Sequence, residues 1–397
     1  MKTFNFRSLF SFFSQPLDPA IRWALVIYLV ARLAASAWAA LAVNIAPVRV
    51  PYIGDPAYET IHRAYPHSHP VLDSLLGVWF RWDTGWFTQV ALYGYQPDDG
   101  TVTVSPLYPH LIRWLGLLLG GEYLLAALLI TNVALIIGLT LLYKLVCLDF
   151  PEFTARRAMI YVLAFPAGFF LLAGYTESVF LCLSLLTFYA ARKSNWALAG
   201  AAGFFSSLAR MQGWVLALPL AYEALAQAQW QPRRAWPGLL AALGAPLGTL
   251  AYNTYLALAG LPGMAEIYAT KWVVTYAPPW TSVIMAVSSL VTGRSTFQDI
   301  VNTMVLFLSL ATIGVSLWKL RPTYWLYTAV LQVIFLMGYL GNEQLHSMVR
   351  YTVVLFPNMI ALALVTQRRW AFGLVLLAFV LLQLVLLAMF VRWIWVA

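Results

Sequence analysis

Asp83 is a residue of this chain that could act in acid–base catalysis. It lies in the stretch WFRWDTGWFTQVALYGY, directly after Arg81 and Trp82. Its carboxylate could take a proton from a substrate hydroxyl group, as a general base does. The alternative is that Asp83 only caps the helix that follows it, which is a common position for Asp. A cap would also fix the direction of the carboxylate, so capping does not exclude catalysis.

Other polar residues are predicted to lie at the same ends of the helices as Asp83 and could converge on it. They occur in GYTES, ARMQG and NEQLHSMVRY, and the candidates are Tyr175, Thr176, Glu177, Arg210, Gln212, Glu343, His346, Arg350 and Tyr351. Ordinary polar turns are the alternative for Glu177, Glu343 and His346. Arg210 differs, because a basic residue is disfavoured on the outer side of a membrane hairpin. It therefore predicts a nearby anion, and a guanidinium matches phosphate in a two-point geometry.

The histidines and cysteines do not predict a metal site. His62, His67 and His69 cluster in IHRAYPHSHP but lack a firm fourth ligand, so we interpret them as part of a solvated loop and keep metal binding as the alternative. Cys147 and Cys182 show neither zinc nor disulfide spacing. We expect no metal ion and no cofactor.

The composition indicates that these residues are positioned by membrane helices. Of the 397 residues, 62% are hydrophobic and only 10% are charged, against about 25% charged in soluble domains. The mean hydropathy is +0.76. Apolar runs of about 20 residues recur along the chain, which is typical of an all-α integral membrane protein. The net charge of +9 lies in short loops and is read as a topology signal, so no nucleic-acid partner is expected.

We predict a single polytopic domain over 1–397 with eleven spans. The expected spans are 21–45, 122–147, 157–174, 176–191, 195–209, 212–228, 236–259, 301–318, 323–340, 350–366 and 371–395. The first of these carries Arg32 and is interpreted as an uncleaved helix, with a signal peptide as the alternative.

Basic residues predict the orientation, because cytoplasmic loops are rich in Lys and Arg. Every proposed inner loop has a basic pair, among them Arg156-Arg157, Arg192-Lys193, Arg233-Arg234 and Arg368-Arg369. Two long loops, 46–121 and 260–300, then face outward. Within the first, we predict an amphipathic helix over 84–94 at the membrane interface, with Trp86, Phe87, Val90 and Tyr93 toward the lipid and Thr84, Thr88 and Gln89 opposite. Asp83 would be its N-cap, and Gly94 would end it.

The chain resembles the PIG-V family of integral-membrane mannosyltransferases. The resemblance rests on motifs that follow one another in the family's order: Arg81-Trp82-Asp83, Gly94-Tyr95, VSPLYP at 104–109, Tyr175-Thr176-Glu177, Ala209-Arg210 with Gly213, and Arg350-Tyr351. Each motif is weak alone, and their order and placement make the set fairly specific. The resemblance is weakest over 215–340, and Ser105 stands where the family has an aromatic residue.

The resemblance implies a GT-C glycosyltransferase fold with its active site on the non-cytoplasmic side. It also implies a polyprenyl- or dolichyl-phosphate sugar as donor, with mannose as the sugar, and an essential role for the Asp matched by Asp83. The acceptor would be a glycolipid or glycan. The setting would be a prokaryotic cell membrane, or the endoplasmic reticulum membrane in a eukaryote, and the protein is expected to be a monomer among membrane lipids.

The expected reaction is a single inverting displacement with Asp83 as the base. Arg210 and Arg350 are expected to bind the donor phosphate, since such contacts are strengthened at low dielectric. The residues expected to contact donor or acceptor are Arg81, Trp82, Trp86, Tyr108, Tyr175, Glu177, Gln212, His346 and Tyr351. Two alternatives stay open. One is a transferase for glucose or arabinose, and the other is a lipid or solute transporter, which would place charges near the bilayer midplane.

Overall fold

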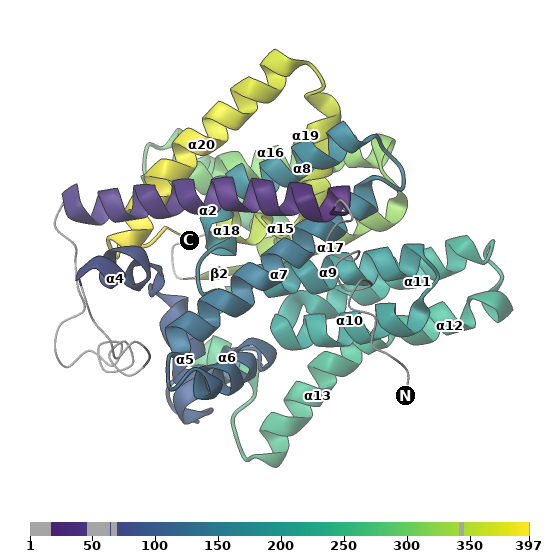
Figure 1. Cartoon of the computed structure of the whole chain (residues 1–397). Coiled ribbons are helices and arrows are strands. Elements are labelled where there is room, and N and C mark those ends of the chain that lie inside the picture. Colours follow the sequence, from purple (N-terminus) through teal and green to yellow (C-terminus); the bar gives the residue numbers. More distant parts are fainter. Residues whose placement is uncertain (1–16, 46–63, 65–69, 341–344, 397) are drawn as a thin grey trace, which may run out of the picture.

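The computed structural model describes residues 17–45, 64, 70–340 and 345–396, and it is helical almost throughout (Figure 1). Four described helices are long and apolar enough to cross a membrane: α2 (Pro19–Ile45), α7 (Tyr123–Val146), α16 (Phe297–Lys319) and α20 (Arg369–Val391). They have 23 to 27 residues. At 1.5 Å per residue they are about 35 to 40 Å long, which exceeds a hydrocarbon core of about 30 Å. The prediction of a multi-pass, all-α membrane protein is confirmed.

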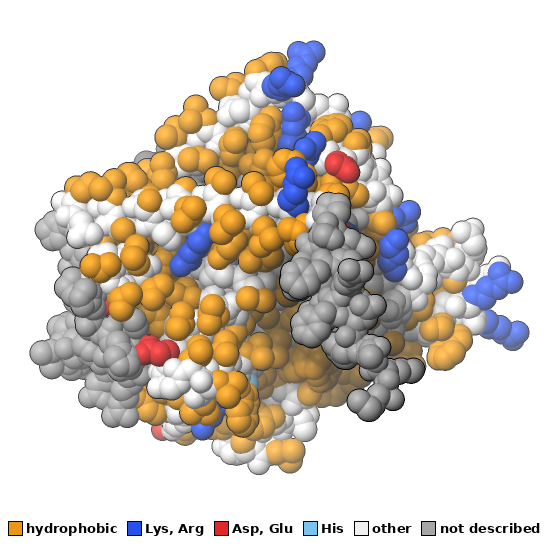
Figure 2. Space-filling model, viewed as in Figure 1, with side chains coloured by type: hydrophobic (Ala, Val, Ile, Leu, Met, Phe, Trp, Pro, Cys, Tyr) orange, Lys and Arg blue, Asp and Glu red, His pale blue; other side chains and the backbone are white. Residues whose placement is uncertain are grey.

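The outward faces of these helices are apolar, as a lipid environment requires. Val30 and Leu33 on α2 are 65% and 68% exposed, and Leu374 on α20 is 60% exposed. Figure 2 shows hydrophobic side chains over the broad surface around α2 and α20. A water-soluble protein would not leave such continuous apolar faces uncovered.

The expected spans 176–191 and 195–209 match the single short helices α9 (Glu177–Arg192) and α10 (Trp196–Ala209) to within one residue. Several other expected spans are divided into two segments. These segments are α8 (Glu152–Ala164) with η3 (Gly168–Leu171), η4 (Met211–Leu216) with α11 (Ala217–Gln227), α12 (Pro232–Ala242) with α13 (Gly244–Leu258), and α18 (Met348–Thr352) with α19 (Phe356–Val365). The predictions of unbroken helices over 157–174 and 350–366 are therefore wrong. The span 236–259 is interrupted at Leu243, whereas 211–227 stays helical and changes from 3-10 to α geometry at Ala217. Pro166 explains the first of these breaks, because the residue before a proline is disfavoured in helical geometry, and Pro357 favours the last, because it has no amide hydrogen to donate to the preceding turn.

The two long loops contain more helix than the sequence predicted. The first holds α4 (Pro70–Leu75), η1 (Gly77–Trp79), α5 (Asp83–Tyr93), η2 (Thr101–Thr103) and α6 (Leu107–Leu118). The second holds α14 (Met264–Thr270), β1 (Val274–Tyr276) and α15 (Pro279–Val291). Strand β1 pairs antiparallel with β2 (Gly338–Leu340), which follows α17 (Pro322–Met337). The expected span 323–340 therefore ends at Met337, and its last residues join the second loop.

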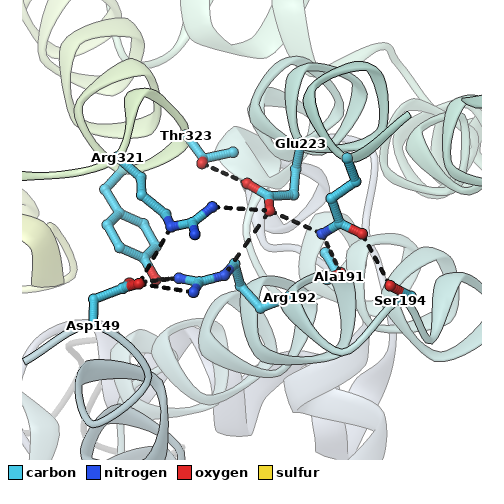
Figure 3. A network of polar contacts seen from close by, with 9 residues as sticks. Asp149, Ala191, Arg192, Ser194, Glu223, Arg321 and Thr323 are labelled. Carbon is cyan, nitrogen blue, oxygen red and sulfur yellow. Dashed lines mark hydrogen bonds and ion pairs between the residues drawn. The ribbon is translucent and has the colours of Figure 1, made fainter. Parts of the chain in front are cut away.

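Two groups of charged residues mark the two ends of α9. Arg192, its last residue, pairs with Asp149 at 2.6 Å and lies 3.9 Å from Glu223 on α11 (Figure 3). Arg321, beside α17, also contacts Asp149 and Glu223, at 3.3 and 3.7 Å (Figure 3). Glu177, the first residue of α9, belongs to a second group. The 16 residues of α9 separate the two groups by about 24 Å.

Basic side chains gather on one side of the molecule. In Figure 2 they cluster on the right, over α8, the start of α20 and the α11–α12 hairpin, whereas Figure 1 shows α5 on the left. This is the asymmetry that the loop charges predicted. The assignment of the basic side to the cytoplasm stays a prediction.

Candidate active site

Four charged residues from four separate segments form one connected chain of ion pairs. The Nη1 atom of Arg350 lies 2.5 Å from Oδ2 of Asp83, and its Nε lies 2.6 Å from Oε1 of Glu177. The same Oε1 accepts a hydrogen bond from Nη1 of Arg210 at 2.6 Å. Arg210 also donates to the hydroxyl of Thr176 at 3.1 Å. The prediction that these outer-end residues converge on Asp83 agrees with this geometry.

Burial separates the roles of the four residues. The side chain of Asp83 is 30% exposed, whereas those of Arg210, Arg350 and Glu177 are 11%, 6% and 0% exposed. Asp83 is thus the member of the chain that a bulky substrate can reach most easily. Glu177 is a structural counter-ion, because a side chain without exposed surface cannot contact a ligand. Its expected contact with donor or acceptor is not possible in this structure.

Asp83 does not act as the cap of the following helix. Trp82 occupies the N-cap position of α5 with φ 52° and ψ −115°, and it makes no capping hydrogen bond with its side chain. The carboxylate of Asp83 instead points to Arg350. A non-glycine residue at positive φ is uncommon, and such strained positions cluster at functional sites. The interpretation of Asp83 as N-cap is therefore wrong, while Gly94 does end the helix, at φ 79°.

Arg81 and Tyr175 hold the loop that presents Asp83. The buried guanidinium of Arg81 donates to the carbonyl groups of Val391, Gly77 and Phe80, each at 2.8 Å. The hydroxyl of Tyr175 donates to the Arg81 carbonyl at 3.0 Å and accepts from the Asp83 amide at 3.2 Å. Its ring lies 4.6 Å from the guanidinium carbon of Arg350. Both residues are buried and position the loop that carries Asp83, and their expected contact with the donor or acceptor stays a prediction.

Helix α5 is turned differently from the predicted interfacial helix. Thr84 and Thr88, expected on the polar outer face, are fully buried. Their hydroxyl groups donate to the carbonyls of Trp79 and Thr84, so both remain hydrogen-bonded although they are buried. Phe87 is also buried, whereas Tyr93 is 43% exposed. The helix packs into the protein through residues of both predicted faces, Thr84 and Thr88 as well as Phe87 and Val90, so its predicted amphipathic orientation is wrong.

The remaining expected contacts divide into buried and accessible residues. Tyr108 is fully buried and hydrogen-bonds to Thr131 at 2.8 Å, so it is part of the packing and not of a binding surface. Tyr351 lies beside the site, with its ring 5.7 Å from the guanidinium carbon of Arg210. Trp86 is half-buried and packs edge-on against Trp272. Gln212 is half-buried in η4, directly after the turn that carries Arg210.

Two features of the site were not predicted to belong to it. Arg32, inside α2, donates to the carbonyl of Leu172 at 2.9 Å, and Asn132 donates to the same oxygen at 3.3 Å. They satisfy a backbone group that the break after η3 leaves without a helical partner, as the membrane interior demands. The presence of a charged residue, Arg32, within an apolar span could have indicated this role.

The second feature is the segment 392–396, whose residues Trp393 and Trp395 pack edge-on against Trp82 at 5.6 and 5.1 Å.

Gly213 allows the close approach that places Arg210. A Cβ atom at Gly213 would lie 2.5 Å from backbone atoms of Ser206 and Ser207 on α10. The chain can therefore turn from α10 into η4 at this point only without a side chain. The turn directs Arg210 toward Glu177.

No group of three or more His, Cys, Asp or Glu residues in the described part of the chain could hold a metal ion. His62, His67 and His69 lie outside the described residues, as does Glu343. The absence of a metal remains a prediction. The chemistry that the described site offers is proton acceptance by Asp83 and hydrogen-bond donation by two guanidinium groups.

The fold and site thus define an all-helical, multi-pass membrane protein with a charged site at one end of its helices. No protein-family model matches the chain. It is 39% identical over 72 residues to GPI mannosyltransferase 2 of Yarrowia lipolytica, and this stretch is 18% of the chain and 20% of that protein.

Solved structures of the Archaeoglobus fulgidus oligosaccharyltransferase are also similar. The complex with zinc and sulfate has a TM-score of 0.49 at 12% identity, covering 94% of this chain and 53% of that one. The apo form has a TM-score of 0.44 at 14% identity, covering 94% and 55%. The chain thus spans about half the length of the solved relative.

Proposed function

We propose that this protein is an inverting GT-C glycosyltransferase of the PIG-V type that moves a sugar from a polyprenyl- or dolichyl-phosphate donor to an acceptor hydroxyl. The observation that carries the proposal is the partly exposed Asp83 at the end of an otherwise buried chain of ion pairs. The motif order described above and the local similarity to a GPI mannosyltransferase support it. Mannose is the proposed sugar, and a glycolipid or glycan is the proposed acceptor.

Asp83 is the proposed general base. The acceptor oxygen attacks the anomeric carbon, its proton passes to the Asp83 carboxylate, and the bond between that carbon and the phosphate oxygen breaks. Arg350 fixes the direction of the carboxylate through the 2.5 Å contact. A base that is already oriented avoids reorganisation in the transition state.

The two guanidinium groups can also serve the leaving phosphate. Arg210 uses Nη1 for Glu177 and Thr176, and Arg350 uses Nε and Nη1 for Glu177 and Asp83. A guanidinium carries five N–H donors, so each has donors left for phosphate oxygens. The two Arg and two carboxylates sum to zero charge, so the phosphate would be bound mainly by these directional donors. Arg210 is the more exposed of the two arginines and is the proposed main contact.

The proposed setting follows the same reasoning. Asp83 would face the non-cytoplasmic side, because the basic side of the molecule lies at the far ends of the helices. The donor's lipid tail would lie in the membrane among the exposed apolar faces. The protein would act as a monomer in a prokaryotic cell membrane, or in the endoplasmic reticulum membrane of a eukaryote.

Purified protein incubated with labelled polyprenyl-phosphate mannose, glucose and arabinose tests this function. We expect one donor, the mannose form, to lose its sugar to an extracted glycolipid fraction or to water. Asp83→Asn should abolish the loss, and Asp98→Asn, an exposed carboxylate of the same loop, should not. If only the glucose or the arabinose donor is turned over, the proposed sugar changes and the proposed type of reaction stands. Absence of turnover with all three donors contradicts the proposal.

A further inference from the structure

A cavity lies next to the ion-pair chain and is not explained by it. Its volume is about 710 Å³, within the range of 300–1,000 Å³ that is usual for ligand sites. It is lined by the end of α15, the start of α16, residues 345–347 and Trp395. Of the residues expected to bind substrate, only His346 lines it.

Residues of the cavity lining contact the loop that carries Asp83 and the helix that carries Arg350. Trp395 in its lining packs 5.1 Å from the ring of Trp82, the residue directly before Asp83. Ser347, another lining residue, is the N-cap of α18, the short helix that carries Arg350. Asn302 on α16 accepts a hydrogen bond from the Val349 amide at 3.0 Å. A ligand against Trp395 would therefore be separated from Trp82 by the ring of Trp395.

The lining has the chemistry that binds a sugar ring. Trp395 and His346 stack with their planes 15° apart and form one aromatic wall. Hydroxyl and amide groups line the cavity as well, from Ser288, Ser289, Thr292, Thr296, Ser347, Gln298 and Asn302. Aromatic faces attract the weakly positive C–H groups of a ring, and hydroxyl and amide groups exchange hydrogen bonds with its hydroxyls.

Arg294 adds a cation at the rim. It is exposed and is the one Lys or Arg in the cavity lining as far as the structure describes it. Asp299, in the same lining, has Oδ2 engaged by the backbone amide and hydroxyl of Thr296 in a capping box. Arg294 is thus available to donate hydrogen bonds to a ligand at the mouth of the cavity.

We propose that this cavity is the acceptor subsite, which holds a saccharide headgroup against Trp395 and His346 with Arg294 at its rim. This inference rests on the proposed function, and it assigns the acceptor to the side of Asp83 formed by α15, α16 and the segment 392–396. The donor then approaches from the Arg210 side. Separate walls for donor and acceptor are what a direct, single displacement requires, because the two substrates must bind together.

Acceptor and donor kinetics of wild type, Trp395→Leu and Arg294→Gln test the assignment, with octyl glycosides of mannose, glucose and glucosamine as acceptor probes. We expect each variant to raise the acceptor KM about threefold to tenfold, the size of one aromatic or hydrogen-bond contact, and to leave the donor KM unchanged. The matched controls are Trp318→Leu at the other end of α16 and Arg234→Gln on α12, both exposed. They should match wild type.

Direct binding of the glycosides separates this inference from the proposed function. If the glycosides bind to wild type and not to Trp395→Leu, and no protein turns over a donor, the saccharide site stands and the proposed glycosyltransferase activity is overturned. Normal acceptor KM values in both Trp395→Leu and Arg294→Gln overturn the acceptor subsite and keep the enzyme. Absence of glycoside binding to wild type also overturns the subsite. Arg294→Gln keeps the test valid if Trp395→Leu unfolds, because Arg294 is exposed.

Discussion

Arg350 binds Asp83 through Nη1 at 2.5 Å, although 267 positions separate the two residues in the chain. The contact joins the loop after the first span to the start of α18. Because Arg350 is buried, its charge needs partners, and Asp83 and Glu177 supply them. The ion pair therefore helps to hold the loop that presents Asp83.

Replacing Asp83 with Asn should lower sugar transfer by at least about 100-fold, because the proton acceptor is lost while the size is kept. Donor binding should change little, since Arg210 keeps its contacts. The measurement is the single-turnover rate with labelled donor, compared with Asp98→Asn. A folded Asp83→Asn protein with wild-type rates would rule out the general base.

The sequence was sufficient to predict that Asp83, Glu177, Arg210 and Arg350 lie near one another, because each follows or precedes an apolar run on the same predicted side. It was not sufficient to predict which of them pair, since this depends on how short helices pack. Thr84 and Thr88 were assigned to water from their polarity alone. Their hydroxyls bond to carbonyls of nearby backbone, and a pattern of polar letters does not reveal this.

No pattern in the sequence indicated that Trp395 lies close to Trp82. The apolar run over 371–395 predicted one continuous helix, but α20 ends at Val391. Trp393 has φ 59°, which turns the chain back toward Trp82. The hydrogen bond from the side chain of Gln298 to the carbonyl of Trp395 then holds the segment against α16. These are long-range contacts, and no local pattern specifies them.

Arg210→Ala should raise the donor KM about 10- to 100-fold, since a charge-assisted hydrogen bond contributes roughly 1.5–3 kcal/mol. Arg210→Lys should restore only part of the loss, because lysine keeps the charge but lacks the planar fork. Donor KM and transfer rate measure both effects, with Arg233→Ala as the control at the basic end. An unchanged donor KM in Arg210→Ala would place the phosphate elsewhere.

Glu177→Leu should destabilise the protein by about 3–5 kcal/mol, because it leaves two buried guanidinium groups without their shared carboxylate. The double variant Glu177→Leu/Arg210→Met should be more stable than the single variant, since one uncompensated charge is then removed as well. Thermal unfolding in detergent gives both values and the coupling between the sites. Additive effects of the two substitutions would show that the pair does not interact energetically.

Gly213→Ala should destabilise the protein by about 1–3 kcal/mol and impair donor binding. The added Cβ would lie 2.5 Å from backbone of α10, so the turn must open and move Arg210. Gly314→Ala on α16, where a Cβ meets nothing within 4 Å, is the matched control and should be neutral. Thermal unfolding and donor KM report the two effects, and a Gly213→Ala protein with wild-type values for both would contradict the close-approach argument.

The last prediction concerns the polar group at the basic end of α9 (Figure 3). Burial alone would raise the pKa of the Asp149 carboxyl, but the hydrogen bond and charge of Arg192 and the charge of Arg321 hold this pKa below its ordinary value. A carboxyl with a lowered folded pKa stabilises the protein above its unfolded pKa, about 3.9, and loses that effect as the pH falls through the folded pKa. Wild type should therefore have a higher Tm than Asp149→Asn at pH 6, and the difference should shrink as the pH is lowered toward 3. Thermal unfolding of both proteins across this range makes the measurement. A Tm difference that stays constant down to pH 3 would show that the ionised carboxylate of Asp149 does not stabilise this end of the helices.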